Sequence, residues 1–182
     1  MRVNEYLSVL MFQFNMELDC NNQDEYLIET DDFYEQMNKA LKTMQNKQPD
    51  ITLFPELAYQ RKFEEDYRSF SKHERIVVAG SYYEGGVNKT VVFQNGEKYE
   101  IPKGYASGAE PMARKISYRE PEEFLEAELQ KHEFRVKGKK IYIFNCMEYY
   151  NLAYYIARNG KYKDNLFGIF TICSNSNTHV FE

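Results

Sequence analysis

Short apolar segments that each end in a chemically reactive residue are the feature that most constrains this chain. Residues 51–54 (Ile-Thr-Leu-Phe) read as a buried strand, Pro55 ends it, and Glu56 follows at its carboxyl end. Residues 140–144 form a second apolar strand, which delivers Cys146 to the same kind of position just before a helical stretch. In open α/β sheets, ligands bind outside the carboxyl ends of the strands. The pattern therefore predicts an α/β fold with a site at a sheet edge.

A lysine in strand-like sequence lies between these two segments. Lys115 stands in Ala113-Arg-Lys-Ile116, and Lys103, in Glu100-Ile-Pro-Lys103, competes with it for the same role. A carboxylate that is desolvated and unpaired at the mouth of an apolar strand is a better base than an exposed one. One carboxylate, one ammonium and one thiol are together the functional groups of a cysteine-dependent hydrolase.

Strands and helices alternate along the chain. Apolar spacings of three and four residues predict helices, and β-rich runs bounded by turn residues predict strands. We expect one domain over residues 1–182, in which an α/β arrangement of mixed sheets is flanked by helices. The expected strands are 6–14, 51–54, 76–82, 90–93, 134–136, 140–144 and 166–172, and the expected helices are 33–44 (capped by Asp31-Asp32), 61–75, 122–129 and 149–158.

Composition excludes several classes of protein. The 182 residues carry a net charge of −5, which argues against a nucleic-acid-binding surface as the main activity. No segment approaches the length of a membrane span, and the polar N-terminus is not a secretory signal. The three cysteines are too few for a disulfide scaffold, and the three histidines have no metal-binding spacing. We therefore expect a cytoplasmic protein without a metal or another cofactor.

Several motifs occur in a recognisable order. Phe54-Pro-Glu-Leu57, Lys115-Ile116 and Asn145-Cys-Met-Glu148 resemble the Glu–Lys–Cys signature of the nitrilase (carbon–nitrogen hydrolase) superfamily. The segment Ala79-Gly-Ser81 is similar to the end of a family strand, and Asn88 begins a segment similar to the next hairpin. An asparagine-rich stretch at 174–178 is similar to a family loop. The resemblance runs along nearly the whole chain.

The resemblance implies a nitrilase-like α-β-β-α sandwich and a hydrolase that cleaves a non-peptide carbon–nitrogen bond. An amide is the expected substrate in preference to a nitrile. By analogy with the family, Cys146 would form a thioester and Glu56 would act as general base. Lys115 and the backbone N–H of Met147 would stabilise the oxyanion, and Glu123, with Glu122 close behind, would be the second glutamate.

The resemblance also bears on partners. The tyrosines near the motifs, Tyr59, Tyr149 and Tyr150, are candidates for contacts with a small-molecule amide or nitrile. Family members continue beyond the asparagine-rich loop with strands and a helix, so we expect the C-terminal part of the family fold to be absent here. A homo-oligomer, or a module fused to or paired with another protein, would supply what is missing.

Other interpretations remain open. Taken alone, Cys146 suits a small core residue, as Cys20 and Cys173 do, and Glu123 suits a solvated helix face. A nitrilase-like module that binds a ligand or regulates a larger assembly without catalysis is the main alternative. A hydrolase of another fold that pairs Cys146 with His132 or His179 is a further one.

Overall fold

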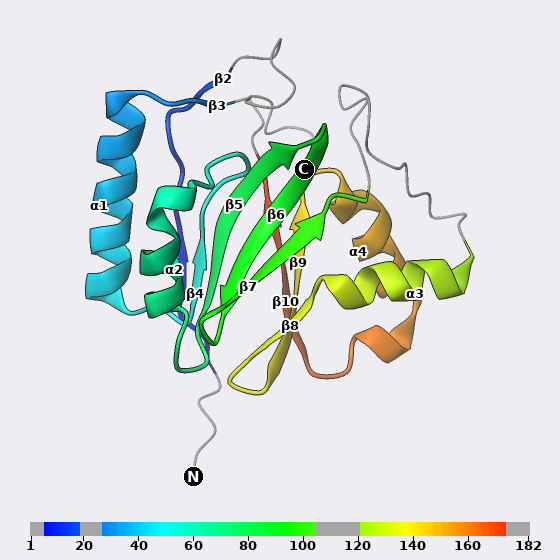
Figure 1. Cartoon of the computed structure of the whole chain (residues 1–182). Coiled ribbons are helices and arrows are strands. Elements are labelled where there is room, and N and C mark those ends of the chain that lie inside the picture. The colour runs from blue at the N-terminus through cyan, green and yellow to red at the C-terminus, as the bar shows by residue number, and fades with distance from the viewer. Residues whose placement is uncertain (1–5, 19–26, 105–120, 174–182) are drawn as a thin grey trace.

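The structure, a computed structural model, describes residues 6–18, 27–104 and 121–173 (Figure 1). Within these residues the chain forms two mixed sheets and a two-stranded ribbon. The ribbon joins β2 (Glu17–Leu18) to β3 (Leu27–Ile28). The first sheet has the order β1 (Val9–Met11), β4 (Ile51–Leu53), β5 (Ile76–Glu84), β6 (Val87–Gln94) and β7 (Glu97–Pro102). The second has the order β10 (Leu166–Ile172), β9 (Lys139–Asn145) and β8 (Glu133–Val136).

Both sheets combine parallel and antiparallel pairs. In the first sheet β1, β4 and β5 run parallel, whereas β6 and β7 add antiparallel hairpins. In the second sheet β10 is parallel to β9, and β8 is antiparallel to it. The expected first strand, 6–14, is shorter in the structure, because only three of its residues pair with β4. The mixed character predicted from the sequence is confirmed.

The first long helix, α1 (Asp31–Lys47), begins earlier than its apolar spacing predicted. Its N-cap is Thr30, whose Oγ1 accepts a hydrogen bond from the Phe33 N–H at 3.1 Å, so the expected Asp31-Asp32 cap was wrong by one position. The two aspartates instead occupy the first turn, where negative charge favours the helix dipole. The helix ends at Gln48, which adopts a left-handed conformation with φ 51°.

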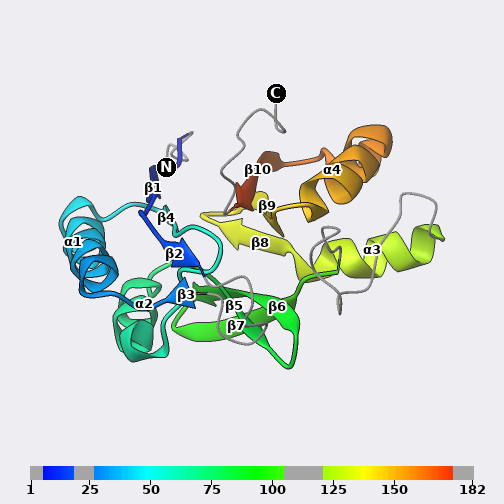
Figure 2. The same cartoon turned by 90° about the horizontal axis from the view of Figure 1, so that it is seen from above.

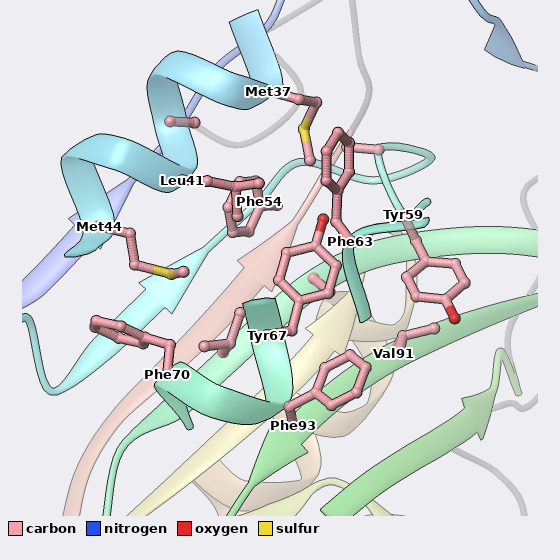
Figure 3. Close-up of a cluster of buried hydrophobic side chains, with 14 of the residues drawn as sticks. Met37, Leu41, Met44, Phe54, Tyr59, Phe63, Tyr67, Phe70, Val91 and Phe93 are labelled. Atoms are coloured by element: carbon pink, nitrogen blue, oxygen red, sulfur yellow. The ribbon is translucent and has the colours of Figure 1, made fainter. Parts of the chain in front are cut away.

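Helices α1 and α2 (Glu64–Phe70) cover the outer face of the first sheet. Figure 3 shows Met37 and Met44 of α1 facing Tyr67 and Phe70 of α2 in one buried cluster. The helix expected over 61–75 is divided, because a 3₁₀ turn (Arg61–Phe63) precedes α2. It also stops early, since two residues after it have positive φ values that a right-handed helix does not allow.

The inner faces of the two sheets pack against each other. Ile76 and Val78 of β5 share a buried cluster with Ile141 and Ile143 of β9. The alternate residues of β9, Tyr142 and Phe144, point the other way, as the twofold repeat of a strand requires. They pack against the helices α3 (Glu122–Lys131) and α4 (Glu148–Arg158). The layers are therefore α-β-β-α, with α1 and α2 on one side and α3 and α4 on the other (Figure 2).

None of the helices in the described segments is both long enough and apolar enough to cross a membrane.

Candidate active site

Glu56 lies in a tight turn that follows β4. The Ala58 N–H donates to the Pro55 carbonyl at 3.3 Å, and Leu57 adopts a left-handed φ of 66°. The neighbouring strand β5 holds this turn, because the Leu57 N–H donates to Ser81 Oγ at 3.0 Å. Proline ends the strand and Ser81 anchors the turn, so the carboxylate is fixed at the sheet edge that the sequence predicted.

Gly80 allows β5 to approach that turn. A Cβ at this position would lie 2.5 Å from the Pro55 carbonyl oxygen, closer than real Cβ atoms approach, and 3.0 Å from the Tyr59 nitrogen, which is also tight. The φ of Gly80 is +99°, a conformation that residues with a side chain rarely adopt. The glycine of the Ala-Gly-Ser motif is thus required by the position of the turn that carries Glu56.

Two buried donors converge on the Glu56 carboxylate. Lys103 Nζ lies 3.0 Å from Glu56 Oε1, and Asn88 Nδ2 donates to the same oxygen at 2.9 Å. Glu56 is 5% exposed and Lys103 is 4% exposed, so the ion pair is withdrawn from water. The unpaired carboxylate considered from the sequence is therefore not what the structure shows, since Glu56 has a cationic partner.

Lys103 comes directly after β7. Its backbone N–H donates to the Asn88 carbonyl at 2.7 Å, which extends the β6–β7 pairing by one residue and sets the side chain beside Glu56. The lysine that the structure places at the carboxylate is thus the competitor identified in the sequence. Lys115 lies outside the described residues, and its role stays a prediction.

Cys146 occupies a strained elbow between β9 and α4. Its φ is 50°, in the left-handed region that residues with a Cβ seldom adopt. Asn145 ends the strand, Met147 is the N-cap of α4, and Glu148 is the first residue of that helix. The backbone N–H groups of a helix N-terminus favour negative charge. This elbow resembles other strained positions from which nucleophiles are presented.

The thiol of Cys146 is hydrogen-bonded to that of Cys173, at the end of β10. This hydrogen bond, burial and the Glu56 charge raise the pKa of Cys146, and the Lys103 ammonium opposes them. The same hydrogen bond lowers the pKa of Cys173. Cys146 therefore rests as a thiol, and its proton must be removed when it attacks a substrate. Because Glu56 and Lys103 act electrostatically on Cys146, the three groups form one cluster.

Glu148 joins the two halves of this cluster. One carboxylate oxygen accepts the Asn145 N–H at 2.8 Å, and the other accepts the Gly104 N–H at 2.6 Å, next to Lys103. Burial raises the pKa of Glu148, whereas His132 and the two backbone donors lower it. His132 Nε2 lies 3.7 Å from Glu148 Oε1. Glu148 thus connects the elbow of the nucleophile with the strand end that carries the lysine.

The remaining candidates lie elsewhere or at the margin. Glu123 is exposed in the first turn of α3, outside the buried cluster, as a solvated helix face would place it. Tyr59 is a core residue whose hydroxyl donates to Glu64 and accepts from Lys98 Nζ at 2.8 Å. Tyr149 and Tyr150 are partly exposed in the first turn of α4, close to Cys146 in sequence.

Sequence reasoning missed three polar residues of the cluster. Asn88 bridges the sheets, since its Nδ2 donates to Glu56 and its Oδ1 accepts from Asn145 Nδ2 at 3.3 Å. From sequence, Glu148 has no role beyond its place in the cysteine motif, and Cys173 suits an ordinary core residue. An available signal was that Asn88, Asn145 and Glu148 are polar residues within or beside otherwise apolar strands.

Among the described residues, no group of three or more His, Cys, Asp and Glu side chains is arranged to hold a metal ion. The cluster is instead a carboxylate, an ammonium and a thiol, supported by two asparagines and a second carboxylate.

Comparisons with known proteins give structural matches alone. No known family profile matches the sequence, and no curated protein does. A glutamine-dependent NAD+ synthetase from Acinetobacter baumannii matches with a TM-score of 0.50 and 13% identity, over 93% of this chain and 32% of that one. The NitN amidase of Nesterenkonia sp. AN1 matches with a TM-score of 0.49 and 12% identity, over 96% of this chain and 70% of that one.

The fold conclusion combines the synthetase match with the layer order. Two mixed sheets packed face to face, with helices outside both, form the arrangement predicted from the sequence motifs. The chain covers about a third of the synthetase, so the likeness is to one part of that enzyme. The chain has a nitrilase-like α-β-β-α fold.

Proposed function

We propose that this protein is a carbon–nitrogen hydrolase that cleaves a small amide through a thioester at Cys146. The observation that carries the proposal is the buried Lys103–Glu56 pair at 3.0 Å, which acts electrostatically on the Cys146 thiol. Carboxylate and ammonium groups beside a thiol provide the base and the oxyanion stabiliser that amide cleavage needs. The nitrilase-like fold supports the same reaction class by analogy.

Each residue has a defined part in the reaction. Glu56 takes the proton from Cys146 Sγ as the sulfur attacks the amide carbonyl carbon. The negative charge that develops on the carbonyl oxygen is stabilised by the Lys103 ammonium and by the Met147 N–H at the start of α4. The C–N bond then breaks as Glu56 returns the proton to the leaving nitrogen. Glu56 next deprotonates a water molecule that hydrolyses the thioester, which releases the acid and restores the thiol.

We assign the cationic role to Lys103 because its Nζ lies 3.0 Å from Glu56 Oε1. The resemblance alone favoured Lys115 for this role, and a Lys103→Met variant tests the choice against Lys115→Met. Loss of turnover with Lys103→Met, and little change with Lys115→Met, is the expected result. A reversed outcome would return the role to Lys115.

The reaction is tested by ammonia release from a panel of simple carboxamides and the matching nitriles, with intact-mass detection of an acyl-enzyme. The expected result is ammonia from at least one amide and an acyl adduct on Cys146. Cys146→Ala should abolish both signals. In Glu56→Gln, we expect turnover to fall by roughly a hundredfold or more, because a positioned general base typically contributes that much. Cys20→Ala is the matched control and should retain both signals.

The alternative is a nitrilase-like ligand-binding module without turnover. It predicts saturable binding of an amide, seen as thermal stabilisation, with neither ammonia nor an acyl adduct. That combination would refute the hydrolase and support the module. A cytoplasmic location, an oligomeric state and contacts of Tyr149 and Tyr150 with the substrate remain parts of the proposal.

A further inference from the structure

The parallel pairing of β9 and β10 places Cys146 opposite Cys173. The last paired positions of the two strands are Asn145 and Ile172, and the two cysteines are the next residues of each strand. The Cys146 N–H donates to the Ile172 carbonyl at 2.8 Å. In a parallel ladder, a residue donates to the carbonyl that precedes its partner. By this rule, Cys146 pairs with Cys173.

The same rule can be checked elsewhere in this molecule. In the β1–β4 pair, the Ile51 N–H donates to the Ser8 carbonyl at 3.0 Å, and the partner of Ile51 is Val9. The bond from Cys146 to Ile172 has the same form one sheet away. The pairing therefore extends one residue beyond β9, to the elbow that carries the thiol.

This spacing suits a covalent bond between the two sulfurs. Neighbouring strands lie about 4.8 Å apart. A disulfide needs a Cα–Cα separation of about 4.4–6.8 Å, so the backbone does not have to move far. Both cysteines are free and partly exposed, and their side chains already share a hydrogen bond. Close approach, a suitable backbone and access from solvent thus coincide at one pair.

We propose that Cys146 and Cys173 are an oxidation site, at which a hydroperoxide converts the two thiols into a reversible disulfide. The reaction goes beyond the proposed hydrolysis and does not rest on it, because it needs the two sulfurs, a base for the Cys146 proton and the oxidant, but no amide substrate. It removes the nucleophile Cys146 from use while the disulfide lasts. It also prevents the irreversible oxidation that a lone exposed thiolate undergoes.

The first step takes place at Cys173. The hydrogen bond from Cys146 stabilises the thiolate of Cys173, and the thiolate is the form that reacts with peroxides. The Cys173 sulfur attacks one peroxide oxygen, the S–O bond forms and the O–O bond breaks. The other oxygen takes up the proton that Cys173 lost on ionisation and leaves as an alcohol, or as water when hydrogen peroxide is used. Sulfur is oxidised by two electrons to a sulfenic acid, and the peroxide is reduced.

The second step closes the disulfide. Cys146 gives up its proton to the Glu56 carboxylate, and its sulfur attacks the sulfenic sulfur of Cys173. The S–S bond forms and the S–O bond breaks. The departing hydroxide takes the proton from Glu56 and leaves as water. Two thiols and one hydroperoxide thus give one disulfide, one water molecule and one alcohol, and an added dithiol reverses the change.

The experiment treats the full chain with hydrogen peroxide, blocks the remaining thiols and maps the peptides by mass spectrometry. The expected result is a Cys146–Cys173 cross-link that dithiothreitol removes, with Cys20 still alkylatable. In Cys146→Ser, the sulfenic acid should persist on Cys173 and be trapped by dimedone. In Cys173→Ser, no disulfide to Cys146 should form.

The wild-type arm decides the matter without relying on any variant that fails to fold. Free thiols at both positions after peroxide treatment, direct conversion of Cys146 to a sulfonic acid, or a disulfide to Cys20 would each overturn the proposal. These readouts are peptide masses, so they hold whether or not the protein hydrolyses an amide. An absence of ammonia release together with the cross-link would refute the hydrolase alone.

Discussion

Replacement of Lys103 by methionine should sharply destabilise the fold. The substitution keeps most of the side-chain volume but removes the ammonium that lies 3.0 Å from the Glu56 carboxylate, and Glu56 is only 5% exposed. At an effective dielectric constant of about 20, unit charges about 3 Å apart attract each other by about 5–6 kcal/mol. Breaking a buried pair by removing one partner typically costs about 3–5 kcal/mol, because the other charge is left uncompensated.

Urea unfolding, followed by circular dichroism, measures this cost as a free energy, and thermal unfolding measures it as a change in Tm. For a domain of this size, about 1 kcal/mol corresponds to roughly 2–4 °C in Tm, so Lys103→Met should lower Tm by roughly 6–20 °C. The double variant Lys103→Met, Glu56→Gln should recover part of the loss, since the buried Glu56 charge is then removed together with the ammonium. Lys39→Met is the matched control, because Lys39 pairs with Glu35 at 2.6 Å on the exposed face of α1 and should cost less than about 1 kcal/mol.

The pattern across the variants is more informative than any single value. If Lys103→Met costs no more than Lys39→Met, and the added Glu56→Gln change recovers nothing, the two groups are not a buried ion pair. The placement of Lys103 at the candidate site would then be wrong, together with the mechanism built on it.

Three further changes test other parts of the structure. Glu148→Gln should destabilise the protein by about 1–3 kcal/mol, because one of two backbone donors loses its acceptor. Burial raises the pKa of Glu148, so wild-type stability falls as pH rises above the pKa that this group has in the unfolded chain. The difference in unfolding free energy between wild type and variant, measured by urea unfolding, should therefore be smaller at pH 8 than at pH 5. Gly80→Ala should lower Tm and slow the proposed turnover together, because its Cβ meets the Pro55 carbonyl; unchanged values would show that the turn can move freely. Met37→Ala should cost about 2–5 kcal/mol in the same unfolding assay, since Met37 is fully buried on the inner face of α1. A loss below about 1 kcal/mol would contradict that packing.

Local patterns predicted the elements better than their ends. The apolar spacing over 33–44 predicted α1, and the apolar run 140–144 predicted β9, whose side chains the structure divides between two cores. The ends depended on single contacts that spacing does not encode. Thr30 caps α1 because its hydroxyl reaches the Phe33 N–H, and α2 ends at Phe70, shortly before the backbone turns left-handed at His73.

The site was predicted in part. Glu56 and Cys146 each follow a buried strand, so their placement at strand ends could be deduced from local sequence. The partner of Glu56 could not, because two lysines lay in similar strand-like contexts and β7 decides that Lys103 reaches the carboxylate. Asn88 and Glu148 act by joining elements distant in sequence, and no local pattern reports such contacts.

The order of the two sheets along the chain has a consequence for synthesis. The first sheet, with Glu56 and Lys103, is complete by Pro102, whereas the nucleophile follows β9 more than forty residues later. A chain emerging from the ribosome therefore carries Glu56 and Lys103 before it carries β9, which covers the apolar inner face of the first sheet. The arrival of β9 buries that face and brings the sulfur into place in the same event. Reactivity of the thiol would thus report on whether the newly made chain has finished folding.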